Sequence, residues 1–139
     1  MSDPRDLYPL SEKAPHLVRT ATGLGPEDFT VDAVLEGRIS ARDLAIMPEV
    51  LRLQARIARA CARDRLAENF ERAAELTSVP QALLLDTYEL LRPGRAASAE
   101  VLRDRAAQLR REYGAERIAA LIEEAAEIGD RRGLFTKRF

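Results

Sequence analysis

The chain has 139 residues, a formal net charge of −1 and 46% hydrophobic residues, a composition typical of one globular domain. The nearly neutral charge excludes a general attraction to nucleic acid or to an anionic membrane. The lone Cys61 excludes an internal disulfide and a multi-cysteine metal site, and 5% aromatic residues are few for a small-molecule pocket.

Residues 1–29 are predicted to form an extended N-terminal arm. Prolines restrict the backbone there and interrupt any long helix, at Pro4, Pro9, Pro15 and Pro26. Tyr8 and Leu10 are apolar points in this otherwise polar segment. Two interpretations of the arm remain open: a partly disordered tail, or a strap that binds a partner protein.

The first helices are predicted after the arm. A short helix over residues 31–36 is expected to end at Gly37, because glycine readily adopts the left-handed conformation. Ser40 with Asp43 resembles a capping box, and Pro48 suits the first turn of the next helix. Apolar residues recur on that helix at helical spacing, at Val50, Leu53, Ile57 and Cys61.

Two further helices are predicted in the middle of the chain. The first is expected to bury one face, made of Leu66, Phe70, Ala73 and Ala74. Ser78 and Gln81 are predicted to cap the second, with Pro80 in its first turn. The inward face of the second helix is predicted to hold Leu84, Tyr88 and Leu91.

Two longer helices complete the chain. Ser98 is predicted to cap one, with an apolar face of Leu102, Ala106, Leu109 and Tyr113. Gly114 separates it from the last helix, marked by Ile118, Leu121, Ile122, Ala125 and Ile128, and Gly129 and Gly133 are expected to end the pattern. The sequence therefore predicts an all-α protein, a small helical domain of about five to six helices over residues 30–139, with the N-terminal arm and no second domain.

No residue is predicted to be catalytic, cofactor-binding or metal-ligating. His16 is the only histidine and lacks further ligands nearby, and Cys61 has no second histidine to act as its base. Glycine-rich phosphate loops are absent from the sequence. Acidic residues alternate with arginine on the polar helix faces, which is the pattern of a solvated surface.

A basic stripe offers the main alternative function. Arg52, Arg56, Arg59 and Arg63 are spaced four, three and four residues apart, so they share one helix face. A nucleic-acid-binding protein would direct such a stripe at phosphates. The stripe is short and no aromatic residue interleaves it, so ion pairs with carboxylates of a partner or of this chain are the favoured interpretation.

Several segments, taken together, carry a resemblance to a known family. The longest segment runs from Arg63 to Pro80. It is preceded by Tyr8-Pro9-Leu10, Asp28-Phe29-Thr30, Val34-Leu35 and Leu51-Arg52-Leu53-Gln54-Ala55, and it is followed by Leu91-Arg92-Pro93. In this order, the segments resemble the small subunit of adenosylcobalamin-dependent diol dehydratases. Arg63–Ala67 and Glu71 are more similar to the diol branch than to the related glycerol dehydratases.

The resemblance implies a function in a larger enzyme. It implies a holoenzyme that converts a vicinal diol such as 1,2-propanediol to an aldehyde plus water by a radical mechanism, with adenosylcobalamin bound by other subunits. It implies a heterohexamer with two copies each of a large barrel subunit, a medium subunit and this small subunit. The remaining alternatives are a glycerol dehydratase small subunit and an unrelated helical interaction module.

The expected functional surface is therefore an interface with partner subunits. We expect Tyr8, Leu10, Arg63, Arg65 and Phe70 to contribute to it. Neither a nucleic acid nor a membrane partner is expected, and the expected location is the cytoplasm. Only seven residues precede Tyr8, too few for a stable helix, so entry into a bacterial microcompartment is expected only through another subunit.

Overall fold

The computed structural model describes residues 2–135, and every regular element among them is helical. Five helices of eleven residues or more, α3 to α7, occur there together with two short α-helices and four 3-10 turns. This confirms the predicted all-α class. The chain divides into two compact units, Met1–Thr77 and Ser78–Phe139. The predicted division at residues 29 and 30 stays a prediction.

The N-terminal segment of the first unit packs on α3 (Pro48–Ala60) through short helical turns. These turns are η1 (Pro4–Leu7), α1 (Leu10–Lys13), η2 (Pro15–Leu17) and η3 (Pro26–Asp28). Leu10 and Ala14 are buried together with Ile57 of α3, and partly buried apolar side chains surround them. Burial of this small cluster fixes the segment to the helix, because it removes apolar surface from water.

A buried carboxylate ties the same segment to the chain around residue 40. Asp43 lies in η4 (Ala41–Leu44), and its Oδ2 accepts hydrogen bonds from the backbone N–H and the hydroxyl of Ser40, both at 2.8 Å. Its Oδ1 accepts from the hydroxyls of Thr20, at 2.8 Å, and Thr22. The predicted capping box is thus confirmed. The preceding helix α2 (Val31–Leu35) is followed by Gly37 at φ 71°, as expected.

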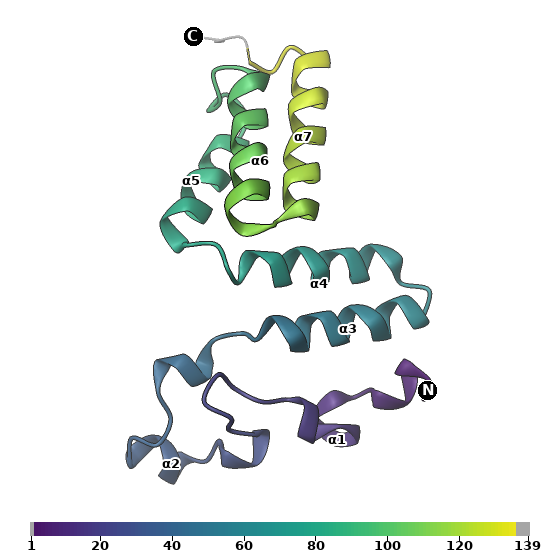
Figure 1. Cartoon of the computed structure of the whole chain (residues 1–139), viewed down its shortest axis with the longest axis vertical. Helices are drawn as coiled ribbons and strands as arrows, with labels where there is room; N and C mark the ends of the chain where they lie inside the picture. Colours follow the sequence, from purple (N-terminus) through teal and green to yellow (C-terminus); the bar gives the residue numbers. More distant parts are fainter. Residues whose placement is uncertain (1, 136–139) are drawn as a thin grey trace. The chain divides into compact units, whose positions relative to one another are not determined.

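The helices α3 and α4 (Asp64–Leu76) form an antiparallel hairpin (Figure 1). Ala62 turns the chain with φ 56°. Its N–H donates to the Arg59 carbonyl at 3.0 Å, and the Arg63 N–H donates to the Ala58 carbonyl at 2.9 Å. This is a Schellman motif with alanine where glycine is usual. Small buried side chains line the contact between the two helices, at Ala55, Ala58 and Ala67.

Two expectations for this hairpin were wrong. Cys61, the last member of the apolar series predicted for α3, is exposed, because it is the C-cap residue with which that helix ends. On α4 the fully buried positions are Ala67 and Ala74, whereas Leu66 is 37% exposed and Phe70 is half-buried. Because α3 and α4 approach each other closely, the small side chain of Ala67 lies in their contact and the larger side chain of Leu66 does not.

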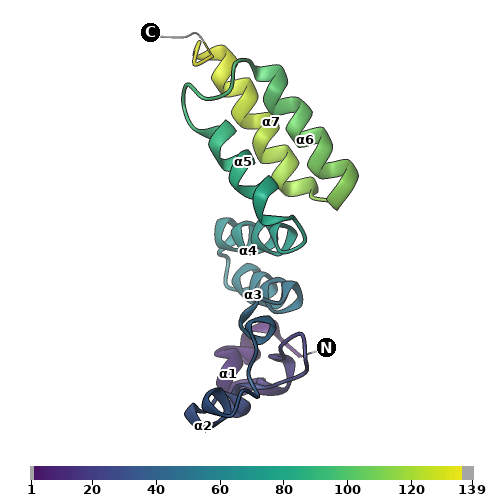
Figure 2. The same ribbon diagram turned by 90° about the vertical axis from the view of Figure 1, so that its left-hand side faces the viewer.

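The second unit contains α5 (Gln81–Leu91), α6 (Ala99–Tyr113) and α7 (Glu116–Arg131), and Figure 2 shows α6 beside α7. Ser98 caps α6, and Gly114 at φ 61° ends it, so both predictions are confirmed. The core lies between α6 and α7, where the largest fully buried side chains are Leu109 and Ile122. Arg110 of α6 donates to both oxygens of Glu123 on α7, at 2.7 and 3.0 Å.

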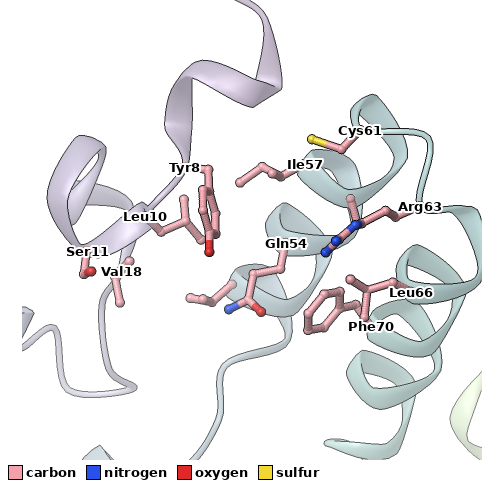
Figure 3. Close-up of a pocket in the computed structure, with 12 residues that line it drawn as sticks. Tyr8, Leu10, Ser11, Val18, Gln54, Ile57, Cys61, Arg63, Leu66 and Phe70 are labelled. Carbon is pink, nitrogen blue, oxygen red and sulfur yellow. The ribbon is translucent and has the colours of Figure 1, made fainter.

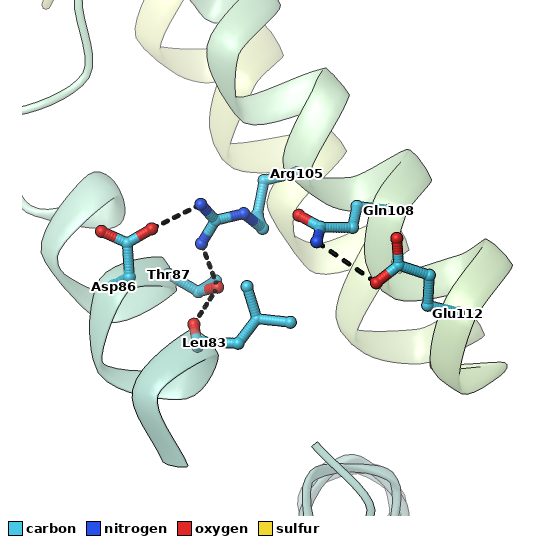
Figure 4. A network of polar contacts seen from close by, with 6 residues as sticks. All are labelled: Leu83, Asp86, Thr87, Arg105, Gln108 and Glu112. Atoms are coloured by element: carbon cyan, nitrogen blue, oxygen red, sulfur yellow. Dashed lines mark hydrogen bonds and ion pairs between the residues drawn. The ribbon is translucent and has the colours of Figure 1, made fainter. Parts of the chain in front are cut away.

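The predicted inward face of α5 was wrong. Tyr88 is 66% exposed, and the buried residue is Thr87. The Thr87 hydroxyl donates to the Leu83 carbonyl and accepts from Arg105 of α6, both at 2.7 Å (Figure 4). These bonds satisfy the hydroxyl, which makes its burial tolerable. Arg105 also pairs with Asp86, so this polar contact links α5 to α6.

Two predicted helix boundaries also differ. The helix α5 begins at Gln81, with Pro80 in the N-cap position and not in the first turn. In α7 the helix continues through Gly129, which is buried, and ends at Arg131. Gly133, at φ 64°, follows the end as expected.

Candidate partner-binding site

A groove of about 740 Å³ lies in the first unit, between the N-terminal segment and the α3–α4 hairpin (Figure 3). Three separate stretches of the chain form its walls. The lining residues are Tyr8, Leu10, Ser11, Val18, Val50, Gln54, Ile57, Ala58, Cys61, Arg63, Leu66 and Phe70.

Most of the groove wall is apolar. Leu10 and Ile57 form its buried base, and Leu66 and Phe70 stand on the α4 side. Tyr8 lines the opposite side with its side chain 69% exposed. Partly exposed apolar surface of this kind gains free energy when another molecule covers it.

Arg63 supplies the one charge among the described residues that line the groove. Arg63 follows the left-handed Ala62, so the Schellman motif fixes its backbone in the turn that connects α3 to α4. Figure 3 shows its guanidinium directed into the groove, toward Gln54. Within residues 2–135 its side chain has no ion-pair partner.

The other arginines of the predicted stripe serve different contacts. Arg59 pairs with Glu71 of α4 through two hydrogen bonds, at 2.9 and 3.1 Å. The pKa of Arg59 lies above its ordinary value, first because of this hydrogen bond and then because of the charge of Glu71. Arg52 and Arg56 are exposed and do not line the groove. One member of the stripe therefore bridges to a carboxylate of its own chain.

Four of the five predicted interface residues meet at this groove: Tyr8, Leu10, Phe70 and Arg63. Leu10 is already buried against its own chain. Arg65 does not line the groove; it lies on an open surface beside Asp64. The role of all five residues in an interface with partner subunits stays a prediction.

The predicted interface left out eight of the residues that line the groove: Ser11, Val18, Val50, Gln54, Ile57, Ala58, Cys61 and Leu66. The periodicity of α3 gave a signal for Gln54 and Cys61. Gln54 lies four residues after Val50 and three before Ile57, and Cys61 lies four residues after Ile57, so both share the face of these apolar positions. Val18 carries no such signal. It reaches the groove only because the N-terminal segment folds back on α3.

Asp43 is the acid with the most perturbed environment. The hydrogen bond from Thr22, followed by those from Ser40, holds the pKa of this carboxyl well below its usual range. Both of its oxygens accept two hydrogen bonds, from donors on two segments of the same unit. These four hydrogen bonds join two segments of the fold through Asp43. Because both oxygens already accept hydrogen bonds, this carboxylate is poorly suited to act as a general base.

The part of the chain that the structure describes has neither a metal-ligating cluster nor a membrane-spanning helix. Residues 2–135 contain no group of three or more His, Cys, Asp or Glu side chains that could hold a metal ion. In the same part of the chain, every helix is too short or too polar to cross a membrane.

Comparison with known proteins gives the class to which this architecture belongs. The family described as the dehydratase small subunit matches residues 4–136, so the chain belongs to that family.

Two relatives make the comparison more specific. The propanediol dehydratase small subunit of Salmonella typhimurium strain LT2 is 47% identical over 131 residues, covering 94% of this chain and 72% of the relative. The propanediol dehydratase small subunit of Citrobacter freundii is 48% identical over 121 residues, covering 87% and 70%.

Proposed function

We propose that this chain is the non-catalytic small subunit of a propanediol dehydratase. In this proposal the holoenzyme is a lyase that converts a vicinal diol, such as 1,2-propanediol, to an aldehyde and water. The names of the two relatives support this substrate and do not favour glycerol. The chain contributes to assembly, and the reacting groups belong to other subunits.

The observation that carries the assembly role is a concentration of exposed apolar side chains within residues 29–46. The most exposed are Leu35 at 80%, Val31 at 75% and Leu44 at 71%, and Phe29, Val34 and Ile46 are also exposed. A chain that worked alone would gain nothing from so much apolar surface in water, whereas an assembly can bury it.

The cofactor in this proposal is adenosylcobalamin, which supplies radical chemistry when bound. The residues of this chain do not form a site suited to it. The groove has one charged and few polar lining residues, and the single histidine, His16, is exposed outside it. We therefore assign the cofactor to the other subunits, and we assign no step of the reaction to residues of this chain.

The proposed partners are a large barrel subunit, which carries catalysis, and a medium subunit, in a heterohexamer with two copies of each chain. Membership of a small-subunit family supports the existence of other subunits. The proposed location is the cytoplasm, where a lone free cysteine such as Cys61 is stable as a thiol. Entry into a microcompartment would depend on another subunit.

Coexpression of this chain with the cognate large and medium subunits tests the proposal. We expect the three to copurify and to convert 1,2-propanediol when adenosylcobalamin is added. Preparations lacking this chain, and the chain alone, should be inactive, and the chain alone should bind no cobalamin by absorbance after gel filtration. Failure of the chain to copurify, or stoichiometric cobalamin binding by the isolated chain, would contradict the proposal.

A further inference from the structure

We propose that the groove receives a segment of a different subunit of the enzyme, which inserts an apolar side chain between Tyr8 and Phe70 and sets a carboxylate against Arg63. This inference rests on the proposed function and adds to it the chemistry of the contact. The occupant is an Asp or Glu flanked by apolar residues.

The shape and surface of the groove indicate a peptide segment. Its volume of about 740 Å³ exceeds the space that one side chain needs, and its walls come from three stretches of the chain. Tyr8 and Phe70 stand on opposite sides of it, and both retain exposed aromatic surface. Aromatic anchors of this kind are enriched where interfaces bury their central contacts.

The charge of Arg63 specifies the second feature of the occupant. No carboxylate is among the described residues that line the groove, so nothing there balances this cation. A segment that covers the groove removes water from Arg63. Desolvation of an unpaired cation is costly, and a carboxylate on the occupant offsets that cost through a charge-assisted hydrogen bond. The planar guanidinium favours a carboxylate in particular.

The position of Arg63 is also preorganised. The Schellman turn holds its backbone, and its side chain is not engaged in an ion pair within residues 2–135. Arg59, on the same stripe, is held by Glu71 and lies outside the groove lining. The contact with the occupant therefore depends on Arg63 and not on the stripe as a whole.

The decisive experiment compares two charge reversals in the full-length chain. Arg63→Glu removes the proposed contact, and Arg52→Glu is the matched control, an exposed arginine of the same stripe outside the groove. Affinity of each labelled chain for the complex of the large and medium subunits is measured by titration. We expect Arg63→Glu to weaken binding by about 30-fold or more, the factor that corresponds to losing one partner of a buried charge pair. The Arg52→Glu control should bind within roughly twofold of the wild type.

Thermal melting separates binding from folding. Because the Arg63 side chain forms no ion pair within residues 2–135, both variants should melt close to the temperature of the wild type. Equal affinities for Arg63→Glu and wild type, or equal losses in both variants, would overturn the inference. Failure of the wild-type chain to bind the other subunits would instead overturn the proposed function.

A photocrosslinking residue in place of Ser11, at the groove wall, identifies the occupant in the assembled complex. We expect a crosslink to a peptide of a different subunit that contains Asp or Glu next to an apolar residue. A crosslink to a second copy of this chain, or to a segment without a carboxylate, would contradict the inference.

Discussion

The ring of Phe135 covers Gly129 on the surface of α7. A Cβ atom added at Gly129 would lie 2.6 Å from Cζ of Phe135, well inside contact distance. The glycine is buried in the last turns of the helix, so the missing side chain is what allows the ring to fold back there. Glycine in a helix costs about 1 kcal/mol relative to alanine, and the ring contact offsets that cost.

A double-mutant cycle tests this relationship. In a Phe135→Ala background, Gly129→Ala should stabilise the chain by about 1 kcal/mol, since only helix propensity changes. With Phe135 present, the gain should be smaller or reversed, because the added methyl displaces the ring. Chemical denaturation of the four proteins gives the coupling energy. Equal gains in both backgrounds would show that the ring does not depend on Gly129.

Ala62 adopts a conformation that glycine would adopt with less strain. The left-handed region costs a non-glycine residue about 1–2 kcal/mol, whereas glycine loses more backbone freedom on folding, about 0.5–1 kcal/mol. We therefore expect Ala62→Gly to stabilise the chain by up to about 1 kcal/mol in urea unfolding. Ala73→Gly, within α4, is the control and should destabilise by about 0.5–1 kcal/mol. A loss of stability from Ala62→Gly would show that the turn is not strained.

Asp43 makes the stability of the first unit depend on acid. Its folded pKa lies below the ordinary value of 3.8, so the ionised form is favoured by folding. The stabilisation is complete above the unfolded pKa and is lost as the pH falls below 3.8 toward the folded pKa. Melting temperatures measured from about pH 6 to about pH 3 should fall, and Asp43→Asn should lower them at neutral pH and flatten the acid dependence. Asp32→Asn, at an exposed acid of α2, should leave the profile unchanged.

Neighbouring residues of α7 should differ sharply in their effect on stability. Ile122 is fully buried between α6 and α7, so Ile122→Ala should cost about 2–5 kcal/mol through lost burial and the cavity left behind. Leu121 is exposed, and Leu121→Ala should cost about 1 kcal/mol or less. Urea unfolding of the full-length chain measures both, and similar losses would contradict the assigned face of the helix.

Local signals predicted much of the fold. Ser98 caps its helix and Gly37 and Gly114 follow theirs, because caps and left-handed turns depend on the few residues around them. The inward face of α5 was mispredicted because leucines occur on several sides of this helix, so periodicity could not select a face. The choice of Thr87 depends on Arg105, which lies far along the chain.

The candidate site could be predicted only in part. Tyr8, Phe70 and Arg63 were found through the family resemblance, but their meeting in one groove depends on packing of the N-terminal segment against α3. No local pattern encodes that packing. Arg65 lies outside the groove because α4 begins directly after the turn at Ala62. The sequence did not predict the left-handed conformation of Ala62 that makes this turn.

The alanines between α3 and α4 have a consequence for the evolution of the groove. Ala55 and Ala67 are fully buried in the hairpin contact but do not line the groove. A larger side chain at either position would push the helices apart and carry Phe70 away from Ile57. The width of the groove is therefore set by residues that never contact its occupant, so partner preference can change through substitutions hidden beneath the binding surface.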